Sequence, residues 1–579
     1  MLKKARGQMQ VTDYIVDFII KKGITDVFGY PGGSISYFVD ALHKREEVHA
    51  HVVYHEQAAA FAAAAYAEIS MKPGIAYSTG GPGATNLITG IGHAYYDSIP
   101  VIMLTGNVNT YERKGSMGIR QRGFQESDII SVVAPLTKYC AYVESADKIR
   151  FYLEKAYSIA MKGRRGPVLL DLPMDVLRMQ INPEELEGYT DEQDHQDSLK
   201  EAYGNRLAEL LNESERPCVV LGNAVKLYDL KEQAISAVAK LKVPCLTSMI
   251  AFDVFGENPL CYGFLGAYGM RAANFIAAKS DLVISIGSRM DIRQIGVKRE
   301  NFAPNARILR IDIDEGELCY KVHEAEESFC MDAKEALEAL NEVNAAKDFS
   351  QWLSVCDTIR SELENYDHQL PNEYIRKLSA LIPENTIITT DVGQNQVWVA
   401  QSFQLKNKQT VLFSGGMGAM GHALPSAIGA YYGTNDKKKV FCICGDGGMQ
   451  MNIQELQFLA REKIPVKIIV FNNHSLGMIR HFQEMYLGAR FHETTEVGGY
   501  TAPDFAKVAE AYGIPSISID QLDMTEQSEE MLISDGPALI EIKIFENTYV
   551  VPKLEFGKPN QDQEPLIDRD LYERLMNLN

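Results

Sequence analysis

Two short polar motifs, each placed at the end of an apolar run, constrain the fold of this chain most strongly. Residues 440–444 lead into Gly445-Asp446-Gly447, and residues 466–471 lead into Asn472-Asn473. Both apolar runs have the length and composition of buried strands, and residues 452–461 between them have a helical pattern. A strand–helix–strand unit of this kind makes two parallel strands whose carboxyl ends share one edge of a sheet.

The side chains at these strand ends suit a small divalent cation. Asp446 and Asn473, 27 positions apart, offer two hard oxygen ligands. A site with few protein oxygens suits Mg²⁺, which keeps positions free for phosphate oxygens and water. Gly445 and Gly447 let the backbone approach a diphosphate closely, and the start of the following helix favours an anion. We therefore expect a magnesium–diphosphate site.

Length and charge indicate a large enzyme with small-molecule substrates. A chain of 579 residues corresponds to about three or four domains. Its formal net charge of −20, without basic runs, argues against a nucleic acid or an anionic membrane as partner. Nine scattered cysteines and an N-terminus without an apolar signal core predict a cytoplasmic protein.

Two polar segments, residues 182–200 and 344–372, divide the chain. They predict domains at 1–185, 195–345 and 365–579. Each block alternates strand-like runs, such as residues 281–286 and 308–312, with helical patterns. The predicted fold class is α/β, with three doubly wound parallel-sheet domains.

A carboxylate stands at the start of an Ala-rich helical segment in the first block. His55-Glu56-Gln57 precedes the apolar residues 58–67. Glu56 could simply complement the helix dipole, which is worth about 0.3–1 kcal/mol. It is not part of a zinc signature, because position 59 is Ala rather than His.

The motifs together resemble those of the thiamine-diphosphate (ThDP) enzymes, in which Gly-Asp-Gly is followed about 25–30 residues later by paired Asn. Within that group the chain is similar to the catalytic subunits of acetohydroxyacid (acetolactate) synthases. Further motifs that carry the resemblance are VFGYPGG at 27–33, GGPGATN at 80–86, DSIP at 97–100, GPVLLDLP at 166–173, DVGQ at 391–394 and GMGAMG at 416–421.

This resemblance implies a fold, a reaction and an assembly. The three domains would be pyrimidine-binding, central and diphosphate-binding, with ThDP held between two subunits of a homodimer or homotetramer. The enzyme would decarboxylate pyruvate and join the hydroxyethyl unit to a second 2-ketoacid, giving 2-acetolactate.

The resemblance also implies roles for individual residues. Glu56 would contact a ring nitrogen of the aminopyrimidine, and Gln125 and Gly33 would face the reacting carbon. The expected metal ligands are Asp446, Asn473 and Ser475. The expected ThDP contacts are Gly393, Gln394, Gly418, Met420, Gly447, Gly448 and Met478. The expected substrate pocket comprises Phe124, Arg293 and Phe482. FAD is expected in the central domain, at Gly222, Arg289 and Asp312.

Three other functions compete with this prediction. Phe482 replaces a Trp of the biosynthetic enzymes, and Arg120 and Arg122 precede Phe124, which favours a larger acceptor such as a nucleotide-linked ketosugar. Gly416-x-Gly418-x-x-Gly421 also fits a dinucleotide fingerprint, which is typical of nicotinamide-dependent oxidoreductases. A catalytically silent subunit would be expected to lose Glu56 or Asp446, and both are present.

Overall fold

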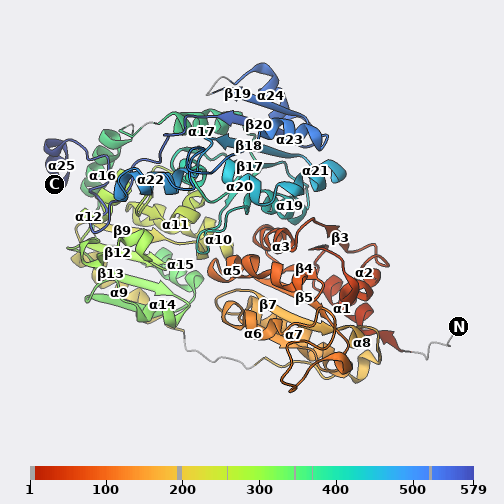
Figure 1. The fold of residues 1–579 in the computed structure, drawn as a ribbon. Helices are drawn as coiled ribbons and strands as arrows, with labels where there is room; N and C mark the ends of the chain where they lie inside the picture. Colours follow the sequence, from red (N-terminus) through yellow and green to blue (C-terminus); the bar gives the residue numbers. More distant parts are fainter. Residues whose placement is uncertain are drawn as a thin grey trace.

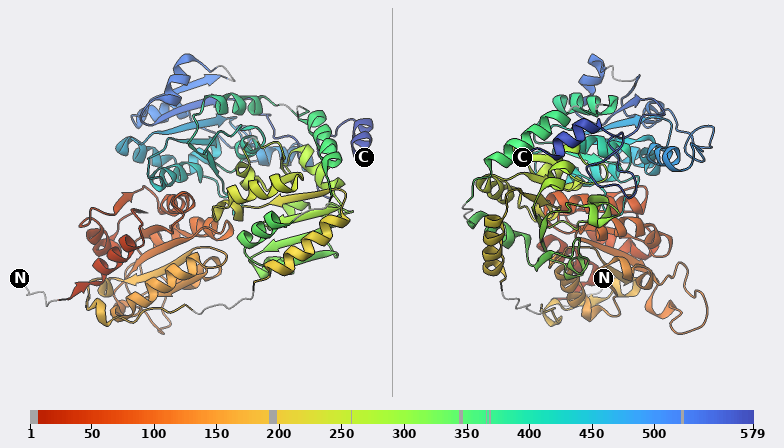
Figure 2. Two further views of the ribbon diagram at one scale, coloured as in Figure 1. Left: turned by 180° about the vertical axis from the view of Figure 1, so that it is seen from behind. Right: turned by 90° about the vertical axis from the view of Figure 1, so that its left-hand side faces the viewer.

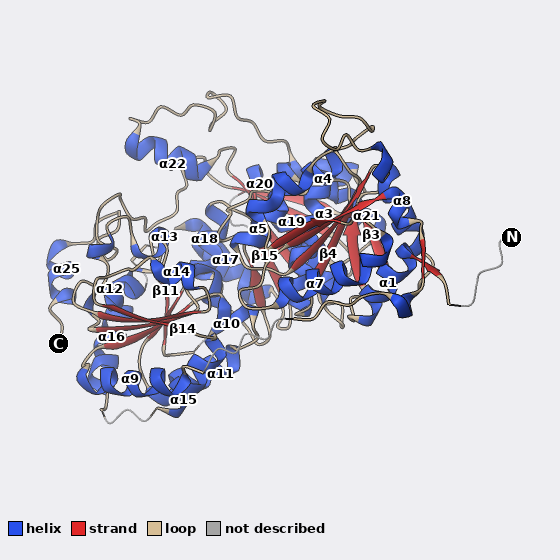
Figure 3. Ribbon diagram, turned by 90° about the horizontal axis from the view of Figure 1, so that it is seen from below, coloured by secondary structure: helices blue, strands red, loops and turns tan. Residues whose placement is uncertain are grey.

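The computed structural model describes residues 7–191, 198–256, 258–343, 347–364, 366–367, 369–520 and 524–579. Three six-stranded sheets, all with parallel strands, organise the chain into N-terminal, central and C-terminal domains (Figure 1). Helices lie on both sides of the strands (Figure 3). The predicted fold class is therefore confirmed. The predicted domain bounds remain predictions, and residues 192–197 and 344–346 of the two polar segments lie outside the described residues.

The N-terminal sheet has the strand order β3-β2-β4-β5-β7-β6. Its strands are β2 (Asp26–Gly29), β3 (His49–Val52), β4 (Gly74–Ser78), β5 (Val101–Asn107), β6 (Tyr139–Tyr142) and β7 (Val168–Pro173). The helices beside it include α1 (Val11–Lys21), α2 (Ser36–Leu42), α3 (Glu56–Ser70), α5 (Ile88–Tyr96) and α7 (Ile149–Met161).

The central sheet has the order β11-β10-β9-β12-β13-β14. Its strands are β9 (Pro217–Leu221), β10 (Cys245–Thr247), β11 (Cys261–Phe264), β12 (Leu282–Ile286), β13 (Arg307–Asp312) and β14 (Glu326–Cys330). Its helices include α9 (Lys200–Glu213), α11 (Lys231–Leu241), α12 (Arg271–Lys279), α13 (Ile292–Ile295), α15 (Ala333–Glu342) and α16 (Ser350–Leu363).

The C-terminal sheet has the order β16-β15-β17-β18-β20-β19, the same pattern as the N-terminal sheet. Its strands are β15 (Ile387–Thr390), β16 (Thr410–Leu412), β17 (Val440–Gly445), β18 (Val466–Asn472), β19 (Ser516–Asp520) and β20 (Ala538–Lys543). Its helices include α17 (Leu370–Leu381), α18 (Gln394–Ser402), α19 (Ala423–Gly433), α20 (Asp446–Met451), α21 (Leu456–Glu462), α22 (Gly477–Tyr486), α23 (Phe505–Ala511) and α24 (Glu526–Ile533).

The apolar sequence of β17 follows from burial on both faces. Val440, Cys442 and Cys444 pack into a core that continues into the N-terminal domain. Phe441 and Ile443 pack into the core on the opposite face. Successive side chains of a strand point to opposite faces, so a strand covered on both sides reads as a continuous apolar run.

Each sheet has a position where two adjacent strands connect onward in opposite directions. This switch point lies between β2 and β4, between β9 and β12, and between β15 and β17. In open α/β sheets, ligands bind outside the carboxyl ends of the strands at such points. The topology therefore provides three candidate ligand sites, one in each domain.

The N- and C-terminal domains pack closely through α3 and α19. A Cβ atom added at Gly429 of α19 would lie 1.9 Å from the carbonyl oxygen of Ala62 in α3, so the two backbones are in contact. Helix α19 follows β16 and a loop.

No helix in the described part of the chain is long and apolar enough to cross a membrane.

The helix expected at residues 452–461 is present as a 3-10 turn, Ile453–Glu455, that leads into α21, and a further helix that was not expected precedes it. Helix α20 begins at Asp446 itself, directly after β17, and the chain turns at Asn452 before α21 begins. The Asn452 side chain explains the break, because it donates hydrogen bonds to the Gly421 carbonyl (2.8 Å) and to Gln57 Oε1 (3.1 Å). Asp446 therefore stands at a helix start, where an anion is favoured.

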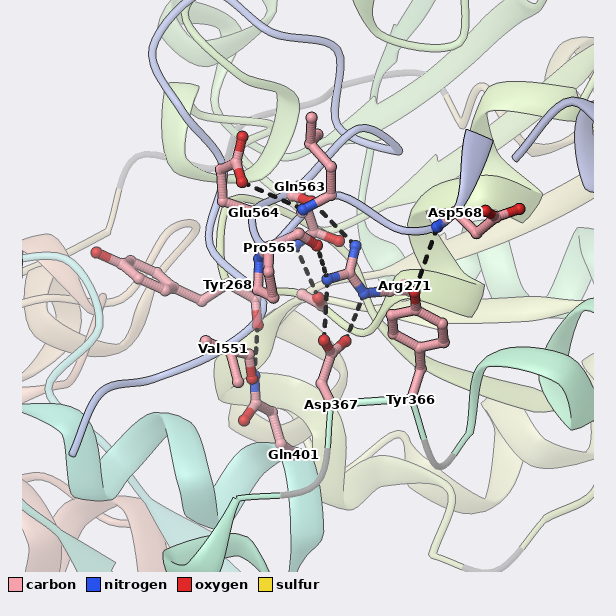
Figure 4. Close-up of polar contacts among 12 residues, drawn as sticks. Tyr268, Arg271, Tyr366, Asp367, Gln401, Val551, Gln563, Glu564, Pro565 and Asp568 are labelled. Atoms are coloured by element: carbon pink, nitrogen blue, oxygen red, sulfur yellow. Dashed lines mark hydrogen bonds and ion pairs between the residues drawn. The ribbon is translucent and has the colours of Figure 1, made fainter. Parts of the chain in front are cut away.

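The C-terminal tail returns to the central domain, where α25 (Arg569–Met576) packs beside α12 (Figure 2). Arg271 of α12 anchors it. The buried guanidinium pairs with Asp367 and donates to the carbonyls of Gln563 (3.0 Å) and Pro565 (2.6 Å) (Figure 4). The tail is thus part of the central domain's packing.

Candidate active site

The carboxyl edge of the C-terminal sheet brings two predicted metal ligands together. Asp446 and Asn473 follow β17 and β18, and they are only 4% and 5% exposed. Asp446 Oδ2 and Asn473 Oδ1 both accept hydrogen bonds from the Ser475 N–H, at 3.1 and 3.2 Å. Asp446 Oδ1 accepts another from the Gly447 N–H (2.9 Å). The two side-chain oxygens therefore converge on one point.

A cation would suit this buried carboxylate. Burial raises the pKa of Asp446 to about 7, although hydrogen bonds from the Gly447 and Ser475 backbones oppose the shift. The described residues contain no group of three His, Cys, Asp or Glu side chains that could hold a metal. An ion here would use one carboxylate, one amide oxygen and backbone carbonyls, which leaves positions for water and phosphate as Mg²⁺ prefers.

The same edge forms a cradle with little room for side chains. A Cβ atom added at Gly447 would lie 2.9 Å from Met420 Cε, and one at Gly448 would lie 2.4 Å from Asp391 Oδ1. The cavity is lined by Gly445 of the signature and by nine of the predicted residues: Gly393, Gln394, Met420, Asp446, Gly447, Gly448, Asn473, Ser475 and Met478. The backbone at the start of α20 lines this cavity, and the N–H groups of a helix start suit a diphosphate.

Two of the residues predicted to contact ThDP, Gln394 and Gly418, are placed differently from the other predicted contacts. The Gln394 side chain is buried and already bonded, accepting from Asn473 Nδ2 (3.2 Å) and donating to the Thr548 carbonyl (2.7 Å). It therefore orients Asn473. Gly418 lies outside this cavity, in the loop between β16 and α19, with a φ of +65° and open space where a side chain would stand.

The carboxyl edge of the N-terminal sheet gathers the predicted catalytic residues. Glu56 begins α3 after β3 and is 8% exposed. Asn86 Nδ2 donates to Glu56 Oε2 (2.9 Å). The other oxygen, Oε1, faces Gly83, where an added Cβ would lie 3.1 Å away. One carboxylate oxygen is thus held by the protein, and a glycine leaves space beside the other.

Gly33 and Gln125 lie at the same edge. No atom stands within 4 Å of a Cβ added at Gly33, so this position borders open space. Gln125 has a φ of +66°, which is uncommon for a residue with a side chain, and its backbone lies against Gly81. Unusual backbone of this kind often accompanies functional positions.

Phe124 does not lie in a pocket within this chain. Its side chain is 85% exposed, in a loop that follows β5 and projects from the domain (Figure 2). The carboxylate of Glu126 holds this loop, accepting from the backbone N–H groups of Lys114 (2.7 Å) and Arg122 (2.9 Å). The role expected for Phe124 in a substrate pocket therefore remains a prediction.

A second cavity lies at the switch point of the central sheet. It is lined by Gly222, Arg289, Asp312 and Arg293, the residues predicted for FAD and for part of the substrate pocket. A Cβ added at Gly222 would lie 1.9 Å from the Gly287 carbonyl, so the two strand ends approach closely. Burial raises the pKa of Asp312.

Sequence reasoning missed the residues that the N-terminal domain adds to this cavity. Asp97, Ser98 and Arg164 line it. Arg164 Nη1 donates to Asp314 Oδ2 and Glu317 Oε1, both at 2.7 Å. These are contacts between domains; the DSIP motif at 97–100 includes Asp97 and Ser98, but it did not indicate that they reach the central domain.

Phe482 lies apart from the cavity at Asp446. It is on α22 and exposed, within an aromatic cluster in which its ring centroid is 4.9 Å from that of Tyr486 and 6.3 Å from that of Phe556. The predicted acceptor pocket at Phe482 remains a prediction.

The raised pKa of Asp446 predicts a pH-dependent stability difference. Folding raises this pKa from 3.8 to about 7, so stability falls as the pH rises through this range and the proton is lost. In metal-free protein, the stability advantage of Asp446→Asn over wild type should be small near pH 4, should grow as the pH rises, and should level off above pH 7 at about 4 kcal/mol, since each pKa unit is worth about 1.4 kcal/mol.

Urea unfolding followed by circular dichroism measures this difference. Asp436→Asn, at an exposed position, is the matched control and should keep the wild-type pH profile. Identical pH profiles for wild type and Asp446→Asn would contradict the assignment.

Comparisons with known proteins identify the family of this chain. Three family models match: "Thiamine pyrophosphate enzyme, N-terminal TPP binding domain" at residues 9–132, the corresponding "central domain" at 205–340, and the "C-terminal TPP binding domain" at 391–542.

The chain is 37% identical over 561 residues to the "Probable acetolactate synthase large subunit" of Methanocaldococcus jannaschii, covering 93% of this chain and 92% of the relative. It is 34% identical to the "Acetolactate synthase large subunit" of Lactococcus lactis subsp. lactis, covering 92% of each. It is also 34% identical to the "Acetolactate synthase isozyme 2 large subunit" of Escherichia coli, covering 96% and 99%. This chain therefore belongs to the acetolactate synthase large-subunit family of thiamine pyrophosphate enzymes.

Proposed function

We propose that this chain is a catalytic subunit that forms 2-acetolactate and carbon dioxide from two molecules of pyruvate, with ThDP and Mg²⁺ bound. The observation that carries the proposal is the convergence of Asp446, Asn473 and Ser475 beside a glycine cradle. Relatives named acetolactate synthase over nearly the whole chain support the choice of reaction.

The C-terminal domain would hold the cofactor's charged end. Asp446 Oδ, Asn473 Oδ1 and the Ser475 carbonyl would bind Mg²⁺, whose charge offsets that of the diphosphate. When bound, ThDP supplies a thiazolium ring that accepts the negative charge left when carbon dioxide departs from pyruvate.

Glu56 would hold the proton that activates the cofactor. Asn86 fixes one carboxylate oxygen, so the other can share a proton with a ring nitrogen of the aminopyrimidine. Behind Glu56, residues 58–65 of α3 are fully buried and apolar except for their backbone. This wall excludes water from one side of the carboxylate and strengthens its interactions.

We place the complete site between two chains. Every residue that lines the cavity at Asp446 belongs to the C-terminal domain, within residues 392–544, and Glu56 is not among them. Glu56 and the exposed Phe124 lie on the N-terminal domain. A homodimer, alone or within a homotetramer, would bring the N-terminal edge of one chain to the C-terminal edge of its partner.

FAD is proposed for the central cavity. The central sheet has the local strand order 3-2-1-4-5-6, which is typical of dinucleotide-binding domains, and the cavity lies at its switch point. Arg289 and Arg293 would face phosphate groups, and Asp312 at the end of β13 would face ribose hydroxyls. The flavin's role would be structural, since joining two pyruvates involves no net redox change.

The alternatives differ in their support. Because the chain belongs to the ThDP enzymes, the prediction of a nicotinamide-dependent oxidoreductase has no support. The glycines that suggested a dinucleotide fingerprint, Gly416–Gly421, lie in the loop that joins β16 to α19. The larger acceptor, such as a nucleotide-linked ketosugar, stays an open prediction, which the product assay below also tests.

Product analysis tests the proposed reaction. Protein incubated with ThDP, Mg²⁺, FAD and pyruvate should release carbon dioxide and accumulate 2-acetolactate, detected by mass spectrometry. Release of acetaldehyde without acetolactate would contradict the proposal, because it would show decarboxylation with no transfer to pyruvate. Adding a nucleotide-linked ketosugar in competition with pyruvate should leave acetolactate as the main product; a dominant sugar adduct would support the larger acceptor instead.

A variant tests the role of Glu56. Glu56→Gln keeps the shape of the side chain but cannot hold the proton, so exchange of the thiazolium C2 hydrogen for deuterium should slow by about 10²–10⁴-fold. The measurement is quenched-flow exchange followed by NMR. Glu68→Gln, which changes a carboxyl group near the other end of α3, should exchange as wild type does. Unchanged exchange in Glu56→Gln would remove Glu56 from the mechanism.

A further inference from the structure

The loop that carries Gly418 and Met420 is held by a side chain from another domain. This loop joins β16 to α19, and at its start Asp97 of the N-terminal domain accepts two hydrogen bonds. Asp97 Oδ2 accepts from the Gly415 N–H (2.9 Å), and Oδ1 accepts from the Gly416 N–H (2.6 Å). Asp97 directly follows α5 and is buried.

A second connection reaches the middle of the same loop. His93, one turn before Asp97 on α5, has its Nδ1 3.2 Å from Asp97 Oδ2 and 3.2 Å from Ser414 Oγ. Ser414 Oγ in turn accepts from the Ala419 N–H (3.1 Å). The chain of contacts therefore runs from the N-terminal domain to the residue next to Met420.

The geometry at the start of the loop permits only glycine. A Cβ at Gly416 would lie 2.7 Å from Tyr96 Cβ and 3.1 Å from Asp97 Oδ1, and one at Gly415 would lie 3.3 Å from Asp97 Oδ1. The far end of the loop is held within its own domain, where Asp391 accepts from the Gly421 (3.0 Å) and Ala423 (2.9 Å) N–H groups. Each end of the loop thus binds one buried carboxylate, and the two carboxylates come from different domains.

We propose that Asp97 is a positioning residue that sets the Gly415–Gly421 loop, and with it Gly418 and Met420, in the conformation that receives the ThDP aminopyrimidine. The inference rests on the proposed function for its cofactor. The clamp, meaning the two hydrogen bonds from the Gly415 and Gly416 N–H groups to Asp97, rests on the observed contacts. Burial alone would raise the pKa of Asp97, but His93 and the two glycine N–H groups lower it overall, so the carboxylate is ionised at neutral pH.

The clamp can be broken with little change in volume. Asp97→Asn keeps one acceptor oxygen and replaces the other by an amide NH₂ group. This group is a donor, so it cannot accept the hydrogen bond from the loop N–H that it faces. A hydrogen bond to a charged acceptor is worth enough to change an equilibrium by about tenfold or more. We expect hydrogen exchange of residues 414–421 in the cofactor-free protein to accelerate by about tenfold, and the calorimetric Kd for ThDP to rise by about tenfold.

Asp253→Asn is the matched control. Asp253 is also a buried carboxylate between domains, and it accepts from the Val411 N–H (3.0 Å) in β16, just before the loop, while pairing with Lys226 and Lys231. It does not contact the loop from Gly415 onward through any of these bonds. Its loss should lower the unfolding temperature but leave loop exchange and the Kd for ThDP within about threefold of wild type.

The two readouts separate the possible failures. Wild-type exchange and ThDP affinity in Asp97→Asn would overturn the proposal, as would equal shifts in Asp253→Asn. If Asp97→Asn does not fold, Ser414→Ala removes the bridge to Ala419 and should shift both quantities in the same direction by a smaller factor; no shift would overturn it. Accelerated loop exchange in a protein whose wild type binds no ThDP would overturn the cofactor role and the proposed function, leaving only the structural clamp.

Discussion

The proposed site depends on one buried carboxylate, that of Asp446 at the carboxyl end of β17. Burying an ionised carboxylate without a counter-charge is unfavourable, and here burial raises its pKa to about 7. An amide oxygen, backbone groups and the Tyr500 hydroxyl surround it, and among the described residues no basic side chain is recorded in hydrogen-bonding contact with it. The proposed Mg²⁺ would satisfy this requirement, and its charge would give the neighbouring glycine cradle affinity for a diphosphate.

Two sheets of the chain have the same topology, and each carries a different part of the proposed site. The N- and C-terminal sheets share one strand order, so both collect functional residues at the carboxyl edge of a switch point. One edge carries the residues of the proposed metal and diphosphate site, and the other carries the Glu56 carboxylate and the open space at Gly33. Close packing of α3 on α19 fixes the two domains of one chain against each other, and Asp97 extends that connection into the loop that carries Met420.

Residues set by local sequence could be predicted, and those set by contacts between domains could not. Asp446 and Asn473 were predicted to lie together because parallel strands bring their ends to one edge, and Gly445 indeed pairs with Phe471 in the β17–β18 register. Helix α20 was not predicted, since the expected helix began at Asn452 whereas α20 begins at Asp446. Asp97 and Arg164 act across domain interfaces, which one sequence does not reveal. Phe124 is exposed in one chain, and its predicted role in a substrate pocket rests on the proposed second chain.

The central claim is that one active site combines Glu56 of one chain with Asp446 of its partner. Complementation tests it most directly: Glu56→Gln and Asp446→Ala chains, each inactive alone, are co-expressed with different tags and the mixed dimer is purified. One of its two sites would then contain both native residues, so about half of the wild-type acetolactate activity per dimer should return, an estimate that treats the two sites as independent. A mixed dimer with no activity, although each chain is folded, would contradict the account and place both residues in the same chain's site.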